Sequence, residues 1–233
     1  MRKPSNVVIF LGPPGAGKGT QAVRLSGALN IPTVSTGEML RHAARSGSET
    51  GKLVASVMAS GQLVSDELIN RVVADRLRQT DCRDGCILDG YPRTVAQARF
   101  LETLLADLNL SAPVVFNFDL SVEKIVRRLS RRRQCPKCGG IFSLNRNVES
   151  IRCQKDGALL IQRADDNPLA IRQRLDVYRA TFAGLIDFYR SRNYREIDAD
   201  RSPNAISQEL LKLLAVPVMA RAAARKYAAM AVA

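Results

Sequence analysis

A glycine-rich loop near the start of the chain has the residue types of a phosphate-binding site. The apolar run of residues 7–11 (VVIFL) leads directly into residues 12–20 (GPPGAGKGT). Glycines let successive backbone N–H groups point at a polyphosphate. A helix that begins near Lys18 adds its positive N-terminal end, and Lys18 itself adds a mobile cation for the outer phosphates. The spacing G-x4-G-K between a strand and a helix therefore indicates a polyphosphate site rather than an ordinary turn, although the hydroxyl of Thr20 stands one position later than in the general pattern.

Four potential metal ligands form a second group. Cys135 and Cys138 are separated by two residues, as are Cys153 and Asp156, and fourteen residues lie between the two pairs. Three thiolates and one carboxylate at this spacing indicate a tetrahedral metal site, for which zinc fits best and iron is the second candidate. Because four protein ligands leave no open position for a substrate, we expect a structural site. A metal-free segment held by packing, with three unpaired cysteines, is the alternative.

The composition narrows the class of protein. The chain has 233 residues, of which 46% are hydrophobic, enough for one large α/β domain with small insertions. It has no apolar run long enough to span a bilayer and no signal peptide, so we expect a cytoplasmic protein. The net charge of +13 indicates anionic partners, among which nucleotides, nucleic acid and acidic membranes all qualify.

Three further residues are expected to have no chemical role. His42 is the only histidine, so histidine-based catalysis has little material, and we expect it on the solvent face of a helix. Cys82 and Cys86 lie outside the group of metal ligands, and we expect both to be buried or half-buried.

An α/β sheet must position these groups. Short runs at residues 86–88, 113–118 and 194–197, with a weaker one at 32–34, predict strands in addition to residues 7–11. Because helical patterns separate these runs, we predict a parallel sheet flanked by helices.

Helix starts can also be located in the sequence. Asn167 followed by proline predicts the start of a long helix, and Ser202 followed by proline predicts another, in which Leu213 is expected to face inward. Ser35 and Glu38 form a capping-box pattern that opens a helix near residue 36.

Two segments interrupt the alternation of strands and helices. Residues of about 35–64 and about 131–167 are expected to be insertions at strand ends, where ligand-binding loops lie in open α/β sheets. We expect one domain over residues 1–216 and an alanine-rich extension over residues 217–233. The extension has a helical pattern that either frays or packs on the core or on an acidic partner, and catalysis is not expected to need it.

Five stretches of the chain, in this order, resemble the motif set of the adenylate kinase family. They are residues 12–20 (GPPGAGKGT), 35–41 (STGEMLR), 61–67 (GQLVSDE), 88–94 (LDGYPRT) and 162–167 (QRADDN). The resemblance covers nearly the whole chain and makes the displaced hydroxyl of Thr20 a family feature. It implies a fold like that of the P-loop nucleoside monophosphate kinases, with two inserted mobile segments: an NMP-binding segment and a lid. The three cysteines and the aspartate resemble the metal-bearing lids of some bacterial members.

The resemblance implies a reversible, magnesium-dependent transfer of the terminal phosphoryl group of ATP to AMP, which gives two ADP. The residue types suit this reaction. A phosphate monoester has a second pKa of about 6, so the attacking oxygen is already anionic at pH 7 and needs no general base. Phosphoryl transfer mainly requires positioning and charge neutralisation, and the planar fork of arginine holds two phosphate oxygens at once.

The resemblance also implies roles for individual residues. The catalytic set comprises Lys18, Asp89, Arg93, Arg132, Arg163 and Arg174, with Asp89 holding magnesium through water. The ATP-binding set comprises Gly15, Ala16, Gly17, Lys18, Gly19, Thr20, Arg128 and Arg132, with Ile141, Phe142 and Arg201 beside the base. The AMP-binding set comprises Thr36, Arg41, Gln62, Leu63, Val64, Gly90, Tyr91, Pro92, Arg93, Gln97, Arg163 and Arg174. Arg131 and Arg133, which flank Arg132, are expected only to decorate a helix end.

Other functions are weighed against this one. A basic zinc-knuckle protein that binds nucleic acid would explain the charge, but 5% aromatic residues and no tryptophan leave no stacking platforms, so no nucleic-acid partner is expected. A mechanical ATPase would end its strand in Asp-Glu, whereas Gly90 follows Asp89 here. A UMP or CMP kinase is the nearer alternative, because Thr36 and Gln97 argue for adenine only by resemblance. We expect a monomer that binds ATP, AMP and ADP.

Overall fold

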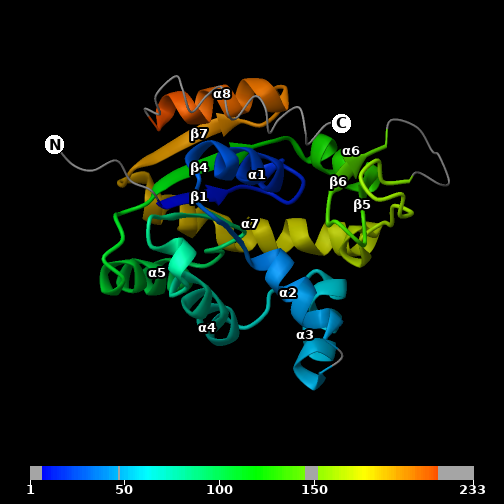
Figure 1. Cartoon of the computed structure of the whole chain (residues 1–233), viewed down its shortest axis with the longest axis horizontal. Coiled ribbons are helices and arrows are strands. Elements are labelled where there is room, and N and C mark those ends of the chain that lie inside the picture. The colour runs from blue at the N-terminus through cyan, green and yellow to red at the C-terminus, as the bar shows by residue number, and fades with distance from the viewer. Residues whose placement is uncertain (1–6, 47, 145–151, 215–233) are drawn as a thin grey trace.

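The computed structural model of the chain describes residues 7–46, 48–144 and 152–214, and its main sheet is parallel with the strand order β2-β3-β1-β4-β7 (Figure 1). All four pairings in this sheet are parallel, which confirms the predicted fold class. Two shorter strands pair antiparallel in a separate ribbon. The strands are β1 (Val7–Leu11), β2 (Thr33–Ser35), β3 (Cys86–Asp89), β4 (Val114–Asp119), β5 (Arg132–Gln134), β6 (Ile141–Ser143) and β7 (Tyr194–Asp198).

Helices connect the strands and cover the sheet. The α-helices are α1 (Lys18–Leu29), α2 (Thr36–Arg45), α3 (Glu49–Ser60), α4 (Asp66–Leu77), α5 (Val95–Asp107), α6 (Val122–Arg131), α7 (Pro168–Arg190) and α8 (Pro203–Leu213). Two single-turn 3-10 helices, η1 (Thr80–Cys82) and η2 (Ala164–Asp166), complete the described elements. None of the helices in the described part of the chain is long and apolar enough to cross a membrane.

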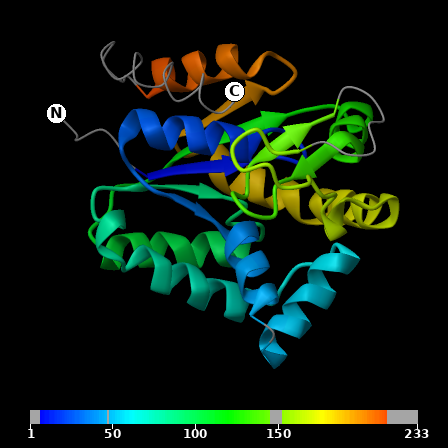
Figure 2. The same cartoon turned by 45° about the vertical axis from the view of Figure 1, so that its right-hand side comes forward.

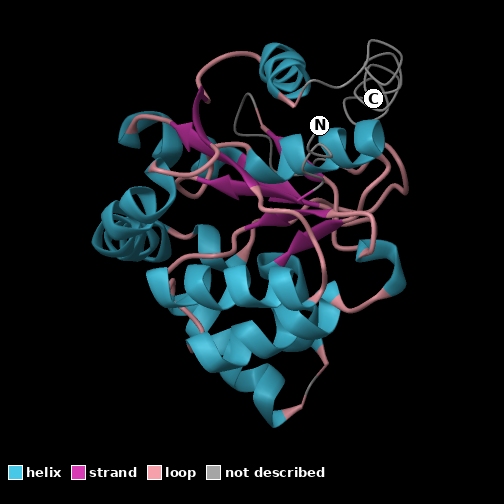
Figure 3. Cartoon of the chain, turned by 90° about the vertical axis from the view of Figure 1, so that its left-hand side faces the viewer, coloured by secondary structure: helices cyan, strands magenta, loops and turns pink. Residues whose placement is uncertain are grey.

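Side chains of β1 alternate between two hydrophobic cores, one on each face of the sheet. Val8 and Phe10 belong to a cluster with residues of α1, α6 and α8, whereas Val7, Ile9 and Leu11 belong to a cluster with residues of α4 and α5. This alternation follows from the period of two residues in a strand. The long helix α7 contributes to both clusters, and Figure 3 shows the sheet between its two layers of helices. Both faces of the central strand are therefore covered, which explains its unbroken apolar sequence.

The two segments predicted as insertions lie at the same end of the molecule. Figure 1 and Figure 2 show α2 and α3 below this end of the sheet, and the ribbon of β5 and β6 above them. The loops that follow β1 and β3 leave the sheet at its carboxyl edge, which is where ligands bind in open α/β sheets.

Most of the predicted helix starts are present. Asn167 caps α7 by accepting a hydrogen bond from the Ala170 amide, and Ser202 caps α8 in the same way through Ala205. Two details of the prediction were wrong. Ser35 precedes α2 without a side-chain capping bond, and the Glu38 carboxylate pairs with Arg41 and Arg163. In α8, Leu213 is 42% exposed.

Other expectations for single residues can be checked as well. Cys82 and Cys86 are buried, and His42 is exposed on α2, as predicted. The predicted extension at residues 217–233 lies outside the described residues.

Candidate functional site

The phosphate loop of residues 12–17 connects β1 to α1 and is held open by its glycines. Gly12 has a φ of 130°, and a Cβ atom there would lie 2.5 Å from the backbone oxygen of Phe118, so only glycine fits. The Nζ atom of Lys18 donates hydrogen bonds to the carbonyl oxygens of Gly12 and Pro13 at 2.7 and 2.8 Å. The ammonium group is thereby folded over the loop on which a polyphosphate would lie.

Asp89 lies beside this loop at the carboxyl end of β3. It is paired in register with Phe10 of β1, the strand that precedes the phosphate loop. A Cβ atom built on Gly19 would come within 3.3 Å of the Asp89 Oδ2 atom, so the start of α1 approaches the carboxylate closely. The structure thus brings one carboxylate to the edge of the phosphate loop.

Lys18 also lies in the field of three arginines from other segments. The pKa of Lys18 is lowered to about 8, mainly by burial and in part by the positive charges of Arg93, Arg174 and Arg132, while Asp89 opposes this shift. These three arginines come from the β3–α5 loop, β5 and α7, and each lies close enough to Lys18 to act on its charge. A space lined by like charges is suited to an anion with several charges.

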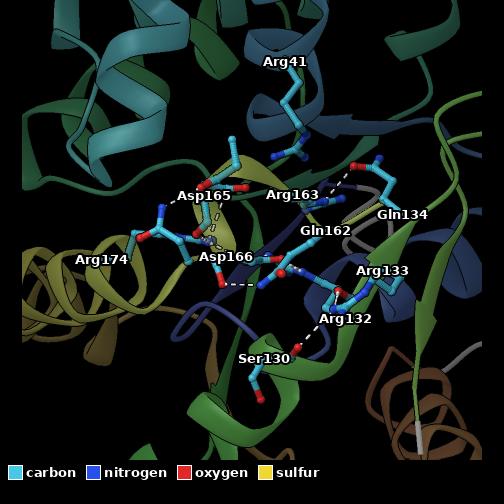
Figure 4. A network of polar contacts seen from close by, with 12 residues as sticks. Arg41, Ser130, Arg132, Arg133, Gln134, Gln162, Arg163, Asp165, Asp166 and Arg174 are labelled. Carbon is cyan, nitrogen blue, oxygen red and sulfur yellow. Dashed lines mark hydrogen bonds and ion pairs between the residues drawn. The ribbon is translucent and has the colours of Figure 1, made fainter. Parts of the chain in front are cut away.

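Two adjacent carboxylates orient the arginines of this space. Arg132 donates from Nε to Asp166 Oδ2 at 2.7 Å and from Nη2 to Asp166 Oδ1, while Arg174 Nη1 lies 3.2 Å from the same carboxylate. Arg174 also pairs with Asp165 at 3.1 Å. Figure 4 shows Asp166 between Arg132 and Arg174, and Asp165 beside Arg174. The side chain of Asp166 is fully buried, so it works as an internal counter-ion that fixes two arginines at once.

Arg163 connects the lid side of the site to α2. Its Nε atom donates to Gln134 Oε1 at 2.8 Å, and its Nη2 atom lies 3.1 Å from Glu38 Oε1. The same Glu38 oxygen accepts from Arg41 Nη2 at 2.6 Å. Burial lowers the pKa of Arg163 to about 10, and the charges of Arg41 and Arg132 act in the same direction. Glu38 is therefore a central acceptor in the site, which the sequence indicated only as a capping residue.

The loop after β3 packs against α2 and α5. Thr36 Oγ1 and Arg93 Nε both donate to the Gly90 carbonyl, at 3.0 and 2.8 Å. The buried Gln97 accepts from the Arg93 amide at 2.7 Å and donates to Asp66 Oδ1 at 2.6 Å. Asp66, whose role the sequence did not reveal, thus fixes the predicted adenine ligand Gln97.

Burial, together with the charges of Arg174 and Arg41, lowers the pKa of Arg93 to about 10, and Asp89 and Asp165 act in the opposite direction. Arg93 therefore belongs to the same positive field as Lys18.

Some predicted site residues have contacts away from Lys18 and its neighbouring arginines. Tyr91 is fully buried and donates to Asn70, so that only its backbone could contact a ligand. Arg128 donates to the Ala199 carbonyl at 2.9 Å, and Arg201 pairs with Glu209.

The remaining predicted residues lie in loops or strands around the site. Gly15, Ala16 and Gly17 form the loop, and Gly19 and Thr20 begin α1; Gln62, Leu63 and Val64 join α3 to α4; Pro92 follows Tyr91; Ile141 and Phe142 are in β6.

The four predicted metal ligands come together in two turns of the lid, which we call the first knuckle (residues 135–140) and the second knuckle (residues 152–158). One ligand atom from each of Cys135, Cys138, Cys153 and Asp156 lies within 4.8 Å of the others. Each knuckle has the same backbone form: Gly139 N donates to Cys135 O and Gly157 N donates to Cys153 O, and both glycines have a φ near 70°.

The spacing of these atoms fits a tetrahedral ion. The Sγ atoms of Cys138 and Cys153 are 3.6 Å apart, and Cys135 Sγ is 3.2 Å from Asp156 Oδ2. Four ligands around zinc with Zn–S bonds of about 2.3 Å would place two sulfur atoms about 3.8 Å apart. The donor set and its geometry could therefore hold a divalent metal without rearrangement of the knuckles.

Comparisons with known proteins agree with this site. The family model described as "Adenylate kinase" matches residues 10–194. Proteins named adenylate kinase from Thermoanaerobacter sp. strain X514 and Archaeoglobus fulgidus are 40% and 42% identical to this chain over 210 residues, which are 89% of this chain and 97% of each relative. The protein of that name from Oceanobacillus iheyensis is 42% identical over 89% of this chain and 98% of its own length. A match of this extent, on a sheet that carries a phosphate loop and converging arginines, shows that the chain belongs to the adenylate kinase family.

Proposed function

We propose how individual residues of this chain carry out the activity of its family, the transfer of the terminal phosphoryl group of ATP to AMP. The observation that supports the roles best is that Arg132 and Arg174 share the Asp166 carboxylate and lie, with Arg93, close enough to Lys18 to lower its pKa. Unfavourable repulsion between cations is expected where a highly charged anion will be bound. Two nucleotides that meet end to end with their phosphates supply such an anion.

The two nucleotides would approach from opposite sides. We assign the phosphate loop with Gly15, Gly17, Lys18 and Thr20 to the ATP phosphates, because its backbone N–H groups and the start of α1 favour anions. We assign Arg41 and Arg93 to the AMP phosphate, with Thr36 and the loop of Gln62, Leu63 and Val64 beside the AMP base. Arg128, Ile141, Phe142 and Arg201 are assigned to the ATP side.

The arginines would stabilise the transferring group. Arg132 and Arg174 share Asp166, so their guanidinium groups are oriented before a ligand binds, which lowers the cost of organising the site during the reaction. Arg163 reaches the same region from the lid. Because the attacking AMP oxygen is already anionic at pH 7, these residues need only position and neutralise charge.

Magnesium accompanies ATP in this family, and the ion neutralises phosphate charge when bound. Asp89 is the residue that we assign to hold it, through water, because its carboxylate lies at the edge of the phosphate loop. For the knuckles we propose a structural zinc ion that would join the two turns of the lid. We also propose that residues 1–216 form the catalytic domain, that residues of about 35–64 and 131–167 close over the substrates, and that the protein is a cytoplasmic monomer.

A coupled assay of phosphoryl transfer with AMP, CMP, UMP and GMP as acceptors tests this proposal. We expect AMP to be strongly preferred, and a preference for UMP or CMP over AMP would make the chain a pyrimidine kinase instead. Arg93→Ala should lower turnover by about a thousandfold, because removing a cation from the transition state has an effect of this size. Arg99→Ala, which removes an exposed arginine of α5, is the matched control and should leave turnover unchanged.

A further inference from the structure

Gln134 lies between the first knuckle and the arginine cluster, and its side-chain amide contacts both. It is the last residue of β5 and is only 8% exposed. Its Oε1 atom accepts the hydrogen bond from Arg163 Nε at 2.8 Å, and its Nε2 atom donates to the carbonyl oxygen of Gly139 at 3.3 Å. Figure 4 shows the side chains of Gln134 and Arg163 facing each other. The amide therefore uses both of its ends, one on the site and one on the knuckle.

The backbone of Gln134 is fixed as firmly as its side chain. Gln134 N donates to Ile161 O at 2.8 Å, and Ile161 N donates back to Gln134 O at 2.9 Å. The next residue, Cys135, donates from its amide to Gly140 O at 2.9 Å, which closes the first knuckle. A change in the knuckle would consequently move the Gln134 amide.

Arg163 needs a fixed hydrogen-bond partner because other arginines lie near it. Its side chain is 10% exposed, and the positive charges of Arg41 and Arg132 push against it. Glu38 holds one end of the guanidinium but is 46% exposed and is shared with Arg41. The hydrogen bond to the buried Gln134 is the contact that fixes Nε, while Glu38 accepts from Nη2.

We propose that Gln134 is a positioning residue that holds the guanidinium of Arg163 against the first knuckle. An ordered knuckle would thereby keep Arg163 aligned with the other phosphate-binding arginines. This inference rests on the role proposed above for Arg163. It gives the knuckle a second task besides stability, namely the alignment of one cation of the site.

Steady-state kinetics of Gln134→Leu test the inference. The substitution removes both hydrogen bonds of the amide, and we expect kcat to fall about tenfold, since a hydrogen bond to a charged group is lost. The KM values for ATP and AMP should stay within about twofold, because the contact is expected to matter mainly in the transition state. Gln134→Glu retains an acceptor for Arg163 Nε but loses the donor to the Gly139 carbonyl, so we expect kcat to fall in this variant as well. Full turnover in Gln134→Glu would show that the contact with the knuckle is not needed and would overturn the inference.

Arg152→Met is the matched control in the second knuckle. Arg152 donates from Nη1 to the carbonyl of Gly157 at 3.0 Å, as Gln134 does to Gly139, and it is exposed to solvent. Its loss should leave kcat unchanged. If Arg152→Met lowered kcat as much as Gln134→Leu, a general loosening of the lid would explain both results and the inference would be wrong.

A double-mutant cycle with Arg163→Lys shows whether Gln134 acts through Arg163. Lysine has no Nε donor at that position, so adding Gln134→Leu to Arg163→Lys should cause no further loss. An additional tenfold loss in that background would show that the two residues act independently and would overturn the inference. Full turnover of Arg163→Lys alone would instead overturn the role of Arg163 in the proposed function.

The melting temperature and the metal content of each variant complete the experiment. The melting temperature and the metal content of Gln134→Leu should equal those of the unmodified protein. If leucine lowers the metal content, Gln134→Met provides an unbranched side chain of similar length that also lacks the hydrogen bonds. Normal kcat in Gln134→Met with full metal content would contradict the inference.

Discussion

At the scale of single residues, the buried carboxylate of Asp166 is expected to contribute more to stability than an exposed carboxylate does. Its buried carboxylate lies between Arg132 and Arg174, so Asp166→Asn would leave two enclosed arginines with less compensation. We expect the free energy of unfolding to fall by about 3 kcal/mol, as when one partner of a buried pair is removed. Urea denaturation measures it. Asp187→Asn removes an exposed partner of Arg190 and should change the value by less than about 0.5 kcal/mol; equal losses in the two variants would contradict the assignment.

Lys18 gives a prediction about pH. Its pKa of about 8 in the free protein lies below its ordinary value of 10.5, so the ammonium group is partly deprotonated above pH 8. A bound polyphosphate would raise this pKa again, and we expect ATP binding at pH 8.5 to take up about 0.7 proton. Calorimetry in buffers with different ionisation enthalpies measures the uptake. Lys18→Arg keeps the charge but does not titrate in this range, so the same uptake in that variant would refute the prediction.

The pKa of Lys18 also affects stability. Because the unfolded chain holds this proton up to a higher pH, the contribution of Lys18 to stability is unfavourable below pH 8 and rises as the pH increases from about 8 to 10.5.

Single residues also show what the sequence could not reveal. The phosphate loop and the metal ligands can be recognised in the sequence because their chemistry depends on residue spacing along the chain. The roles of Glu38, Gln134 and Asp66 cannot be recognised in this way, because each depends on a contact with a residue far away in the sequence. At Glu38 the local pattern was misleading, since a capping box and an ion pair compete for the same carboxylate.

At the scale of elements, the two knuckles predict a bound metal. Their thiolates and carboxylate lie within 4.8 Å of one another, and metal binding adds to folding free energy because the unfolded chain has no preformed site. We expect about one equivalent of divalent metal per chain by elemental analysis, and a lower melting temperature for Cys135→Ser. Cys82→Ser should leave the metal content unchanged. Less than about a tenth of an equivalent after gentle purification would contradict the metal site.

The elements of the sheet were easier to predict than those of the inserted segments. Apolar runs placed β1, β3 and β4 within about one residue of their observed bounds, because a buried parallel strand must be apolar on both faces. The edge strand β7 was also placed within about one residue, although only Ile197 is buried there. The lid strands β5 and β6 have three residues each and carry polar or exposed side chains, so no apolar run marks them.

At the scale of the whole molecule, the proposed segments of about 35–64 and 131–167 should approach each other around the substrates. Glu38 and Arg163 already connect them on one side. Closure would exclude water, which would otherwise accept the phosphoryl group. We expect the radius of gyration in solution scattering to decrease when two adenosines joined by five phosphates are added. Adenosine alone is the control and should have no such effect, whereas an unchanged radius at saturation would rule out closure.

The concentration of positive charge around the phosphate loop has a consequence for the lifetime of the protein in a cell. Lys18 and the arginines repel one another most when the site is empty, and any ligand that binds only the folded state stabilises it. The nucleotide-free form is thus the form that opens most readily to a protease. When the adenylate pool falls, degradation should remove this protein faster, so its abundance would follow the supply of its own substrates.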